Sequence, residues 1–319
     1  MKHQILALAV AALSFTACTN EDNISQDYLA DTPIKLNVSV DEPTTRAGYS
    51  NAELPEGFLL AVHHIDEKVD NKYSYEVWAK KVGDNWKTYK PDETLKGGTD
   101  EEVTMLWANM NDNVSVAAFT NLGDITIPTD QTSDEQLKQA DVLYMPYTSY
   151  PPIKDGITVN LQHAMSKINL TIELGSEYEF SKEEDVDLKI KDVKIDGSLV
   201  SATVYANGIY DESGAPTPIF PFHTGTTPYS KTDGVITKAS ATYEAILIPQ
   251  YIASRNFTVS FKVDGKLYEW TYNQELTLAP NTAYTLKLIA GDDKVQPASF
   301  SVAAWNPGNG ENGENKETD

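Results

Sequence analysis

Apolar and polar residues alternate in short runs along most of this 319-residue chain. In the first clear run, residues 34–40, the apolar side chains are Ile34, Leu36, Val38 and Val40, with one polar residue between each pair. Strict alternation places the apolar side chains on one face of an extended strand. The pattern therefore predicts a strand with one buried face near the start of the folded region.

Similar runs continue along the chain, separated by Gly, Pro, Asn and Asp, which favour turns. Helical periodicity is nearly absent. The best helix candidate covers residues 133–140, where Ser133 can cap the N-terminus and two acids suit the first turn. Further strands are predicted at residues 58–65, 73–80, 103–107, 114–119, 157–161, 168–174, 188–195, 200–205, 243–248, 257–263, 267–272, 284–289 and 300–305.

Many short strands with turns between them indicate an all-β protein built from β-sandwiches. The strands form two sets of similar length, which predicts two sandwiches in tandem, at residues 33–163 and 164–305. We place the join near His163. Residues 306–319 have no apolar side chain except Pro307, so we expect a disordered tail.

The N-terminal sequence has the pattern of an export signal. After Lys2, residues 5–15 are almost wholly apolar. This run is too short to span a bilayer, which needs about 20 residues, but it suits a signal peptide at residues 1–17. Cys18, the only cysteine of the chain, follows directly, and the pattern looks like a bacterial lipobox.

We therefore expect lipidation of Cys18, a tether at residues 18–32 and anchoring in the outer membrane. Glu21 and Asp22 resemble the surface-export signal of Bacteroidetes-type lipoproteins, although an ordinary solvated tether would look the same. Removing residues 1–17 leaves 24 Lys and Arg (25 minus Lys2) against 47 Asp and Glu, a formal charge of −23. Such a surface repels nucleic acid, so no nucleic-acid partner is expected.

Residues with catalytic potential form no recognisable constellation. The histidines lack metal-ligand spacing, and neighbours His63 and His64 would point to opposite faces of a strand. His163 fits a buried, hydrogen-bonded core histidine. Paired acids leave a hydrolase open as a weak alternative. We expect no enzymatic activity, no metal and no cofactor.

Two kinds of residue nevertheless suggest contacts with other molecules. Aromatic side chains, above all Trp86 on a predicted loop and Tyr147, are candidates for stacking on sugars; the alternative, which such residues favour more often, is core and edge packing in a sandwich. Arg46, in the polar segment of residues 44–48 (TTRAG), offers a site to a trypsin-like protease; the alternative is an ordinary surface arginine.

These features together resemble the fimbrillin family, the type V pilin-like proteins with an Mfa-like fold. Besides the lipobox and Arg46, the matching segments in chain order are Leu161–Leu170 (LQHAMSKINL), Ile248–Gln250 (IPQ), Leu278–Tyr284 (LAPNTAY, with Asn281 in the usual glycine position) and Trp305–Gly308 (WNPG). The resemblance implies two transthyretin-like β-sandwiches and a subunit of surface fimbriae that contributes to adhesion to host or bacterial surfaces.

The resemblance also implies assembly by strand exchange. Cleavage between Arg46 and Ala47 would release the first strand, with Ile34, Leu36, Val38 and Val40, and a strand from another fimbrial subunit would replace it. The residues after Trp305 lack the alternation that a donor strand needs. We therefore expect a tip or accessory subunit. The alternative is a surface glycan-binding lipoprotein of a nutrient-uptake system.

Overall fold

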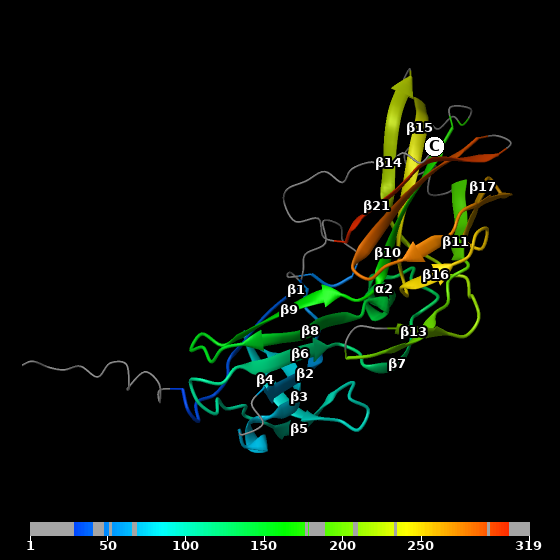
Figure 1. Ribbon diagram of the computed structural model, residues 1–319. Coiled ribbons are helices and arrows are strands. Elements are labelled where there is room, and N and C mark those ends of the chain that lie inside the picture. The colour runs from blue at the N-terminus through cyan, green and yellow to red at the C-terminus, as the bar shows by residue number, and fades with distance from the viewer. Residues whose placement is uncertain are drawn as a thin grey trace, which may run out of the picture.

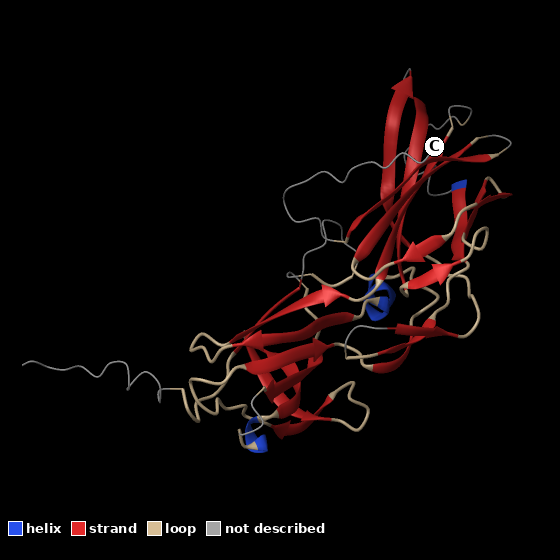
Figure 2. Ribbon diagram, in the orientation of Figure 1, coloured by secondary structure: helices blue, strands red, loops and turns tan. Residues whose placement is uncertain are grey.

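The structure is a computed structural model that describes residues 29–40, 48–50, 53–65, 69–175, 178, 189–206, 210–232, 235–291 and 294–305, without the side chains of residues 210 and 227–238. The predicted signal peptide, Cys18, Arg46, Ala47 and residues 306–319 lie outside the described residues, so the predictions made for them remain predictions. Figure 2 shows that the described chain is mostly strand, which confirms the all-β prediction at that level.

The first half forms an eight-stranded sheet in the order β1-β9-β8-β6-β2-β3-β4-β5 (Figure 1). Neighbouring strands are antiparallel, except that β1 runs parallel to β9. In chain order the strands are β1 (Leu36–Val40), β2 (Gly57–His64), β3 (Tyr75–Val82), β4 (Asn85–Pro91), β5 (Gly98–Glu102), β6 (Val114–Phe119), β8 (Leu143–Tyr150) and β9 (Ile157–His163), with a 3-10 turn at Asn71–Tyr73.

Alternation explains how this sheet buries one face. Phe58, Leu60 and Val62 of β2 are fully buried in a first apolar cluster, as are Val114 and Val116 of β6. Leu29, inside the range predicted as a tether, also packs in this cluster.

The strand predicted at residues 103–107 is not formed. Met105 and Trp107 are buried, as its pattern suggested. However, the backbone of this segment is shared between two partners: Val103 N–H donates to Thr88 of β4, whereas Trp107 N–H donates to Thr32. One isolated bridge, Pro33 to Leu106, results instead of a continuous ladder.

The second half contains a five-stranded sheet in the order β14-β15-β10-β20-β21. Its strands are β10 (Ser166–Leu174), β14 (Phe222–Thr232), β15 (Val235–Leu247), β20 (Thr282–Ala290) and β21 (Val295–Ala304). Three smaller sheets complete the fold. One joins β11 (Ile190–Asp196), β17 (Thr258–Val263) and β18 (Lys266–Thr271), and a second joins β13 (Tyr210–Ser213), β12 (Ser201–Val204) and β7 (Gly123–Thr126). The third pairs β16 (Gln250–Ile252) with β19 (Leu276–Leu278).

A second apolar cluster fills this half, with Ile168, Leu170 and Ile172 of β10 near zero exposure. Residues from 125 to 142 of the range predicted as the first sandwich pack into this second cluster. Among them is the one predicted helix, α2 (Asp134–Ala140), where Ser133 Oγ accepts a hydrogen bond from Gln136 N at 3.3 Å. The predicted domain boundary remains a prediction.

Candidate functional site

The first strand lies at the edge of its sheet. Among the described residues, β1 is the last strand in the order and pairs with β9 alone, with Leu36 opposite Ile157 and Val40 opposite Leu161. Figure 1 shows the two strands side by side. A strand paired along one edge only can be removed without opening the rest of the ladder.

The apolar face of this segment is inserted into the first cluster. Val40 is 1% exposed and Ile34 9% exposed, while Leu36 and Val38 are half-buried against the same cluster. On the other side of the strand, Ser39 Oγ donates to Asn160 Oδ1 at 2.9 Å. The four residues predicted to leave with the first strand therefore share one apolar face.

The residues before β1 pair with a different part of the chain. Asp31 N–H donates to Trp107 O at 2.8 Å, and Ile34 N–H donates to Met105 O at 2.9 Å. Residues 29–40 thus use two sets of backbone partners, the segment around residues 105–107 and strand β9. Without residues 29–40, both sets would lose their hydrogen bonds.

Gly156 allows β1 and β9 to come together. Its φ of 94° lies in the left-handed region, and a Cβ there would lie 2.5 Å from the carbonyl oxygen of Lys35. The next residue, Ile157, donates its N–H to that same oxygen at 2.8 Å. A residue with a side chain at position 156 would disturb the start of the β1–β9 ladder.

A buried polar cluster lies beyond the end of β9 and holds two residues of the matching segments. His163 Nδ1 is 2.9 Å from Asp141 Oδ1, and the imidazole stacks on Trp305 with centroids 4.2 Å apart and planes 1° apart. The Lys167 ammonium lies 5.4 Å from the Trp305 ring. We call Asp141, His163, Lys167 and Trp305 the Asp141 cluster; each is at most 2% exposed. His163 is thus confirmed as a buried, hydrogen-bonded histidine.

Burial lowers the pKa of Lys167 below its usual value, and the negative charges of Glu244 and Asp141 partly oppose this effect. Transfer of an ammonium group out of water is costly unless acids compensate it. The two acids and the Trp305 ring provide that compensation inside the protein. The arrangement suits a structural role.

The chain just after the predicted cleavage site is fixed to this cluster. Tyr49 N–H donates to Asp141 Oδ2 at 2.9 Å, so both carboxylate oxygens of Asp141 are engaged. Gly48 has a φ of 83°, and a Cβ there would lie 2.3 Å from the same oxygen. Lys138 of α2 pairs with Glu53 at 2.5 Å. Gly48 is two residues beyond Arg46.

The other matching segments perform local structural tasks. Gln250 binds the 198–199 turn, because its Oε1 accepts from Leu199 N at 2.9 Å and its Nε2 donates to Ser198 Oγ at 2.9 Å. Asn281 has a φ of 50°, the left-handed conformation that a glycine would adopt most easily. Tyr284 closes the same turn by donating to Thr277 O at 2.7 Å.

The two aromatic candidates for sugar stacking do not meet. Trp86 was expected on a loop, but it lies in β4 and is half-buried, with its ring 5.1 Å from that of Phe58. Tyr147 is 52% exposed on β8. Three strands separate β8 from β4 in the sheet, so the two strands lie about 19 Å apart at the usual strand spacing.

The described residues were also searched for other kinds of site. They contain no group of three or more His, Cys, Asp or Glu side chains placed to hold a metal ion. None of the helices in the described ranges is long and apolar enough to cross a membrane. His63 and His64 follow each other in β2, and burial lowers the pKa of His64.

Comparison with known proteins agrees with this architecture. The model of the fimbrillin-like family matches residues 60–305. Because this match covers most of the chain, the protein belongs to the fimbrillin-like family. A search of curated proteins found no match.

Two solved structures show the same fold, and a third is less similar. A candidate cell adhesion protein from Bacteroides ovatus is similar with a TM-score of 0.59 and 15% identity, over 86% of this chain and 98% of the other. A second, from Bacteroides uniformis, has a TM-score of 0.51 and 16% identity over the same shares. The tip fimbrial protein Mfa3 from Porphyromonas gingivalis, truncated at its C-terminus, has a TM-score of 0.44 and 9% identity, over 84% of this chain and 99% of the other.

Proposed function

We propose that this protein is a tip or accessory subunit of surface fimbriae, assembled by protease-triggered strand exchange and contributing to adhesion. The observation that carries the proposal is the position of β1, an edge strand added in parallel to β9 with its apolar face in the first cluster. In this proposal the chain has two tandem transthyretin-like sandwiches, reaches the outer membrane lipidated at Cys18, and is later incorporated into a fimbrium.

Removal of the first strand would create a binding groove. Leu29, Ile34 and Val40 are buried, and burying side chains of this size stabilises a protein by roughly 1.5–3 kcal/mol each. Their loss, together with the free edge of β9, would leave apolar surface and unpaired backbone groups next to each other. An extended strand from another subunit can satisfy both by β-augmentation.

The surroundings of Arg46 support cleavage at this point in the chain. Arg46 lies between Val40, the end of β1, and Gly48, which is fixed at the Asp141 cluster. Cleavage there would separate a removable strand from a segment that Tyr49 and Glu53 hold in place. The new N-terminus at Ala47 would therefore begin one residue before a fixed position.

The C-terminal part of the chain supports an acceptor and not a donor. β21 pairs with β20 from Val295 to Ala304, and Trp305 after it is buried in the Asp141 cluster. Residues 306–319 have no apolar alternation. A subunit that accepts a strand without donating one would end a fibre, which is the position of a tip or accessory subunit.

The test is to determine the intact mass and N-terminus of the protein in sheared filaments and in the outer membrane. We expect a filament form that begins at Ala47 and a membrane form that begins at acylated Cys18. Arg46→Gln should abolish the filament form, and the matched control Arg255→Gln, which changes the other arginine of the chain, should not. Filaments that contain the uncleaved chain would contradict the proposal.

A further inference from the structure

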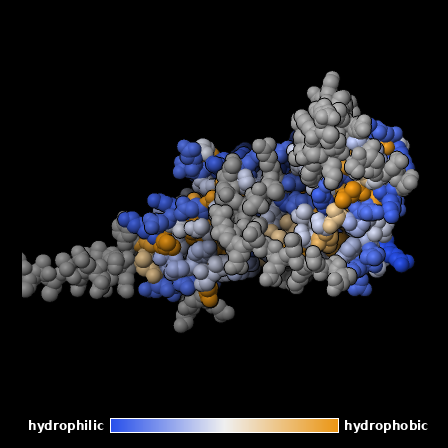
Figure 3. Space-filling view, turned by 90° about the horizontal axis from the view of Figure 1, so that it is seen from above, coloured by the Kyte–Doolittle hydropathy of each residue, from blue (hydrophilic) through white to orange (hydrophobic). Residues whose placement is uncertain are grey.

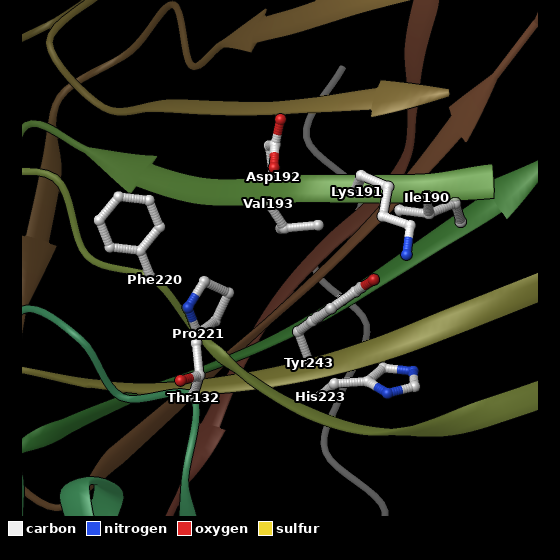
Figure 4. A pocket seen from close by; sticks show the side chains of 9 residues that line it. All are labelled: Thr132, Ile190, Lys191, Asp192, Val193, Phe220, Pro221, His223 and Tyr243. Carbon is white, nitrogen blue, oxygen red and sulfur yellow. The ribbon is translucent and has the colours of Figure 1, made fainter. Parts of the chain in front are cut away.

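A pocket of about 380 Å³ opens in the second half of the molecule, away from β1 and the first cluster. Its walls come from β11, from residues 220–223 at the start of β14, from Thr132 and from Tyr243 of β15 (Figure 4). Phe220 and Pro221 lie at one end of the pocket, and His223 lies at the other. No residue discussed so far as part of the strand-exchange site lines it.

β11 is distorted where it borders the pocket. Its pairing with β17 shifts register between Lys191 and Lys194, and Asp192 has a φ of 53°. In a regular strand, consecutive side chains point to opposite faces, but here Lys191, Asp192 and Val193 all line one pocket. A left-handed conformation at a residue other than glycine costs roughly 1–3 kcal/mol, so the bulge is maintained at a cost to stability.

Asp192 also forms a solvent-exposed ion pair across the bulge. Asp192 Oδ2 lies 2.7 Å from Lys262 Nζ on β17. In Figure 4 the Asp192 carboxylate points away from the pocket, while Lys191 extends toward the side of Tyr243 and His223. The distortion therefore places a hydrogen-bond donor, Lys191, on the pocket wall.

Phe220 is an exposed aromatic ring on a rigid backbone. The side chain is 42% exposed, although its neighbour Ile219 is fully buried. The backbone is held on both sides: Phe220 N–H donates to Thr129 O at 2.8 Å, and Gln131 N–H donates to Phe220 O at 2.9 Å. A ligand that stacks on this ring would not have to order the loop first, which favours binding.

The opposite end of the pocket carries polar ring atoms. His223 is exposed and pairs in register with Tyr243, with ring centroids 5.1 Å apart. Thr132, also exposed, lies beside Pro221 in Figure 4 and donates its hydroxyl proton to Asp130 Oδ1 at 2.6 Å, so its oxygen can accept a hydrogen bond. The pocket thus combines an exposed apolar ring with polar atoms on its wall.

We propose that this pocket binds a saccharide. A sugar ring has an apolar C–H face, which stacks on an aromatic ring, and hydroxyl groups at its edge, which both donate and accept hydrogen bonds. Phe220 offers the stacking surface, and Lys191, His223 and Thr132 place polar atoms on the pocket wall. A purely apolar ligand would desolvate the Lys191 ammonium group without giving it a hydrogen bond in return. The pocket adds a recognition site that the strand-exchange proposal does not require.

On the face shown in Figure 3, apolar groups of the described residues lie among mainly hydrophilic ones. Tyr147, 52% exposed on β8, is an exposed aromatic outside the pocket and therefore serves as a matched control for Phe220.

The experiment is a glycan array probed with the mature chain, followed by calorimetric titration of the best saccharide. We expect defined saccharides to bind, and Phe220→Ala to weaken binding by at least about tenfold. Lys191→Gln should weaken it severalfold without altering the pocket wall, and it decides the matter if Phe220→Ala does not fold. Tyr147→Ala should leave the affinity unchanged.

Three results would overturn the proposal: no saccharide binding by the wild-type chain, wild-type affinity in both pocket variants, or an equal loss in Tyr147→Ala. The last result would move the site to β8. Incorporation into filaments is measured in parallel. Because the pocket lies outside the strand-exchange site, Phe220→Ala should still enter filaments, so failure of one proposal can be told from failure of the other.

Discussion

Strands β1 and β10 have similar sequence patterns but very different places in the molecule. Both alternate apolar and polar residues, IKLNVSV at residues 34–40 and KINLTIEL at residues 167–174. β1 has one neighbour, β9, whereas β10 lies between β15 and β20 with hydrogen-bonded partners along both edges. The comparison teaches that alternation predicts a strand but not its number of neighbours, and in our proposal the strand with a single neighbour is the one that is exchanged.

The largest expected difference between the two strands is in the stability that each contributes. Leu170 of β10 is 1% exposed, so Leu170→Ala should lower the free energy of unfolding by about 2–5 kcal/mol. Leu36 of β1 is only half-buried, and Leu36→Ala should cost about 1 kcal/mol. Urea unfolding measures both, and equal losses would contradict the view that β1 is the removable strand.

The sequence predicts the strands with strong alternation well. Val114–Phe119 is found as β6 with the predicted bounds, and the helix begins after Ser133 as expected. The sequence pattern does not reveal β5 (GTDEE), because its five residues are all exposed at the sheet edge and none is apolar enough to mark a buried face. Sheet order, including the parallel pairing of β1, depends on contacts between distant segments that no local pattern encodes.

The same limit applies to the candidate site. The burial of His163 is predictable, but its partner Asp141 lies 22 residues earlier at the end of α2, where nothing in the local sequence distinguishes it from the other acids. The need for glycine at positions 48 and 156 is likewise invisible in the sequence. It follows only from the structure, in which Asp141 lies close to Gly48 and the Lys35 carbonyl lies close to Gly156.

The second prediction tests the Asp141 cluster, which holds β10 and the segment after Arg46 together. Asp141→Ala leaves the His163 ring and the Tyr49 N–H without their buried acceptor, which should cost about 3 kcal/mol. The control, Asp134→Ala, removes a largely exposed acid from α2 and should cost under about 1 kcal/mol. Chemical unfolding of the two variants decides; similar small losses would show that the cluster contributes little.

The third prediction concerns the docking of β1 alone. Gly156→Ala places a Cβ against the Lys35 carbonyl and strains a left-handed residue, so it should cost about 1–2 kcal/mol and speed hydrogen exchange in β1 and β9. Gly83→Ala is the matched control, because Gly83 also has a positive φ, 61°, but no atom near its Cβ position. If both variants exchange alike in β1, the contact with Lys35 does not govern docking.

The smallest expected effect is a change in how stability depends on pH, and it arises from Lys167 at the start of β10. Because burial lowers the pKa of Lys167 in the folded protein, the unfolded chain binds more protons than the folded chain between the lowered pKa and the usual value near 10.5. The contribution of Lys167 to stability therefore rises with pH across that window.

Tyr49 and Tyr284 act in the opposite direction above pH 10, since burial raises the pKa of both. The contribution of Lys167 must therefore be isolated by comparison with Lys167→Met, which keeps an apolar stem but cannot titrate. We expect the free energy of unfolding of the wild-type chain, relative to that of Lys167→Met, to increase as the pH approaches 10.5. Parallel pH profiles would mean that Glu244 and Asp141 fully compensate the burial of the ammonium group. The buried start of β10 would then have no electrostatic cost of burial that distinguishes it from the edge strand β1.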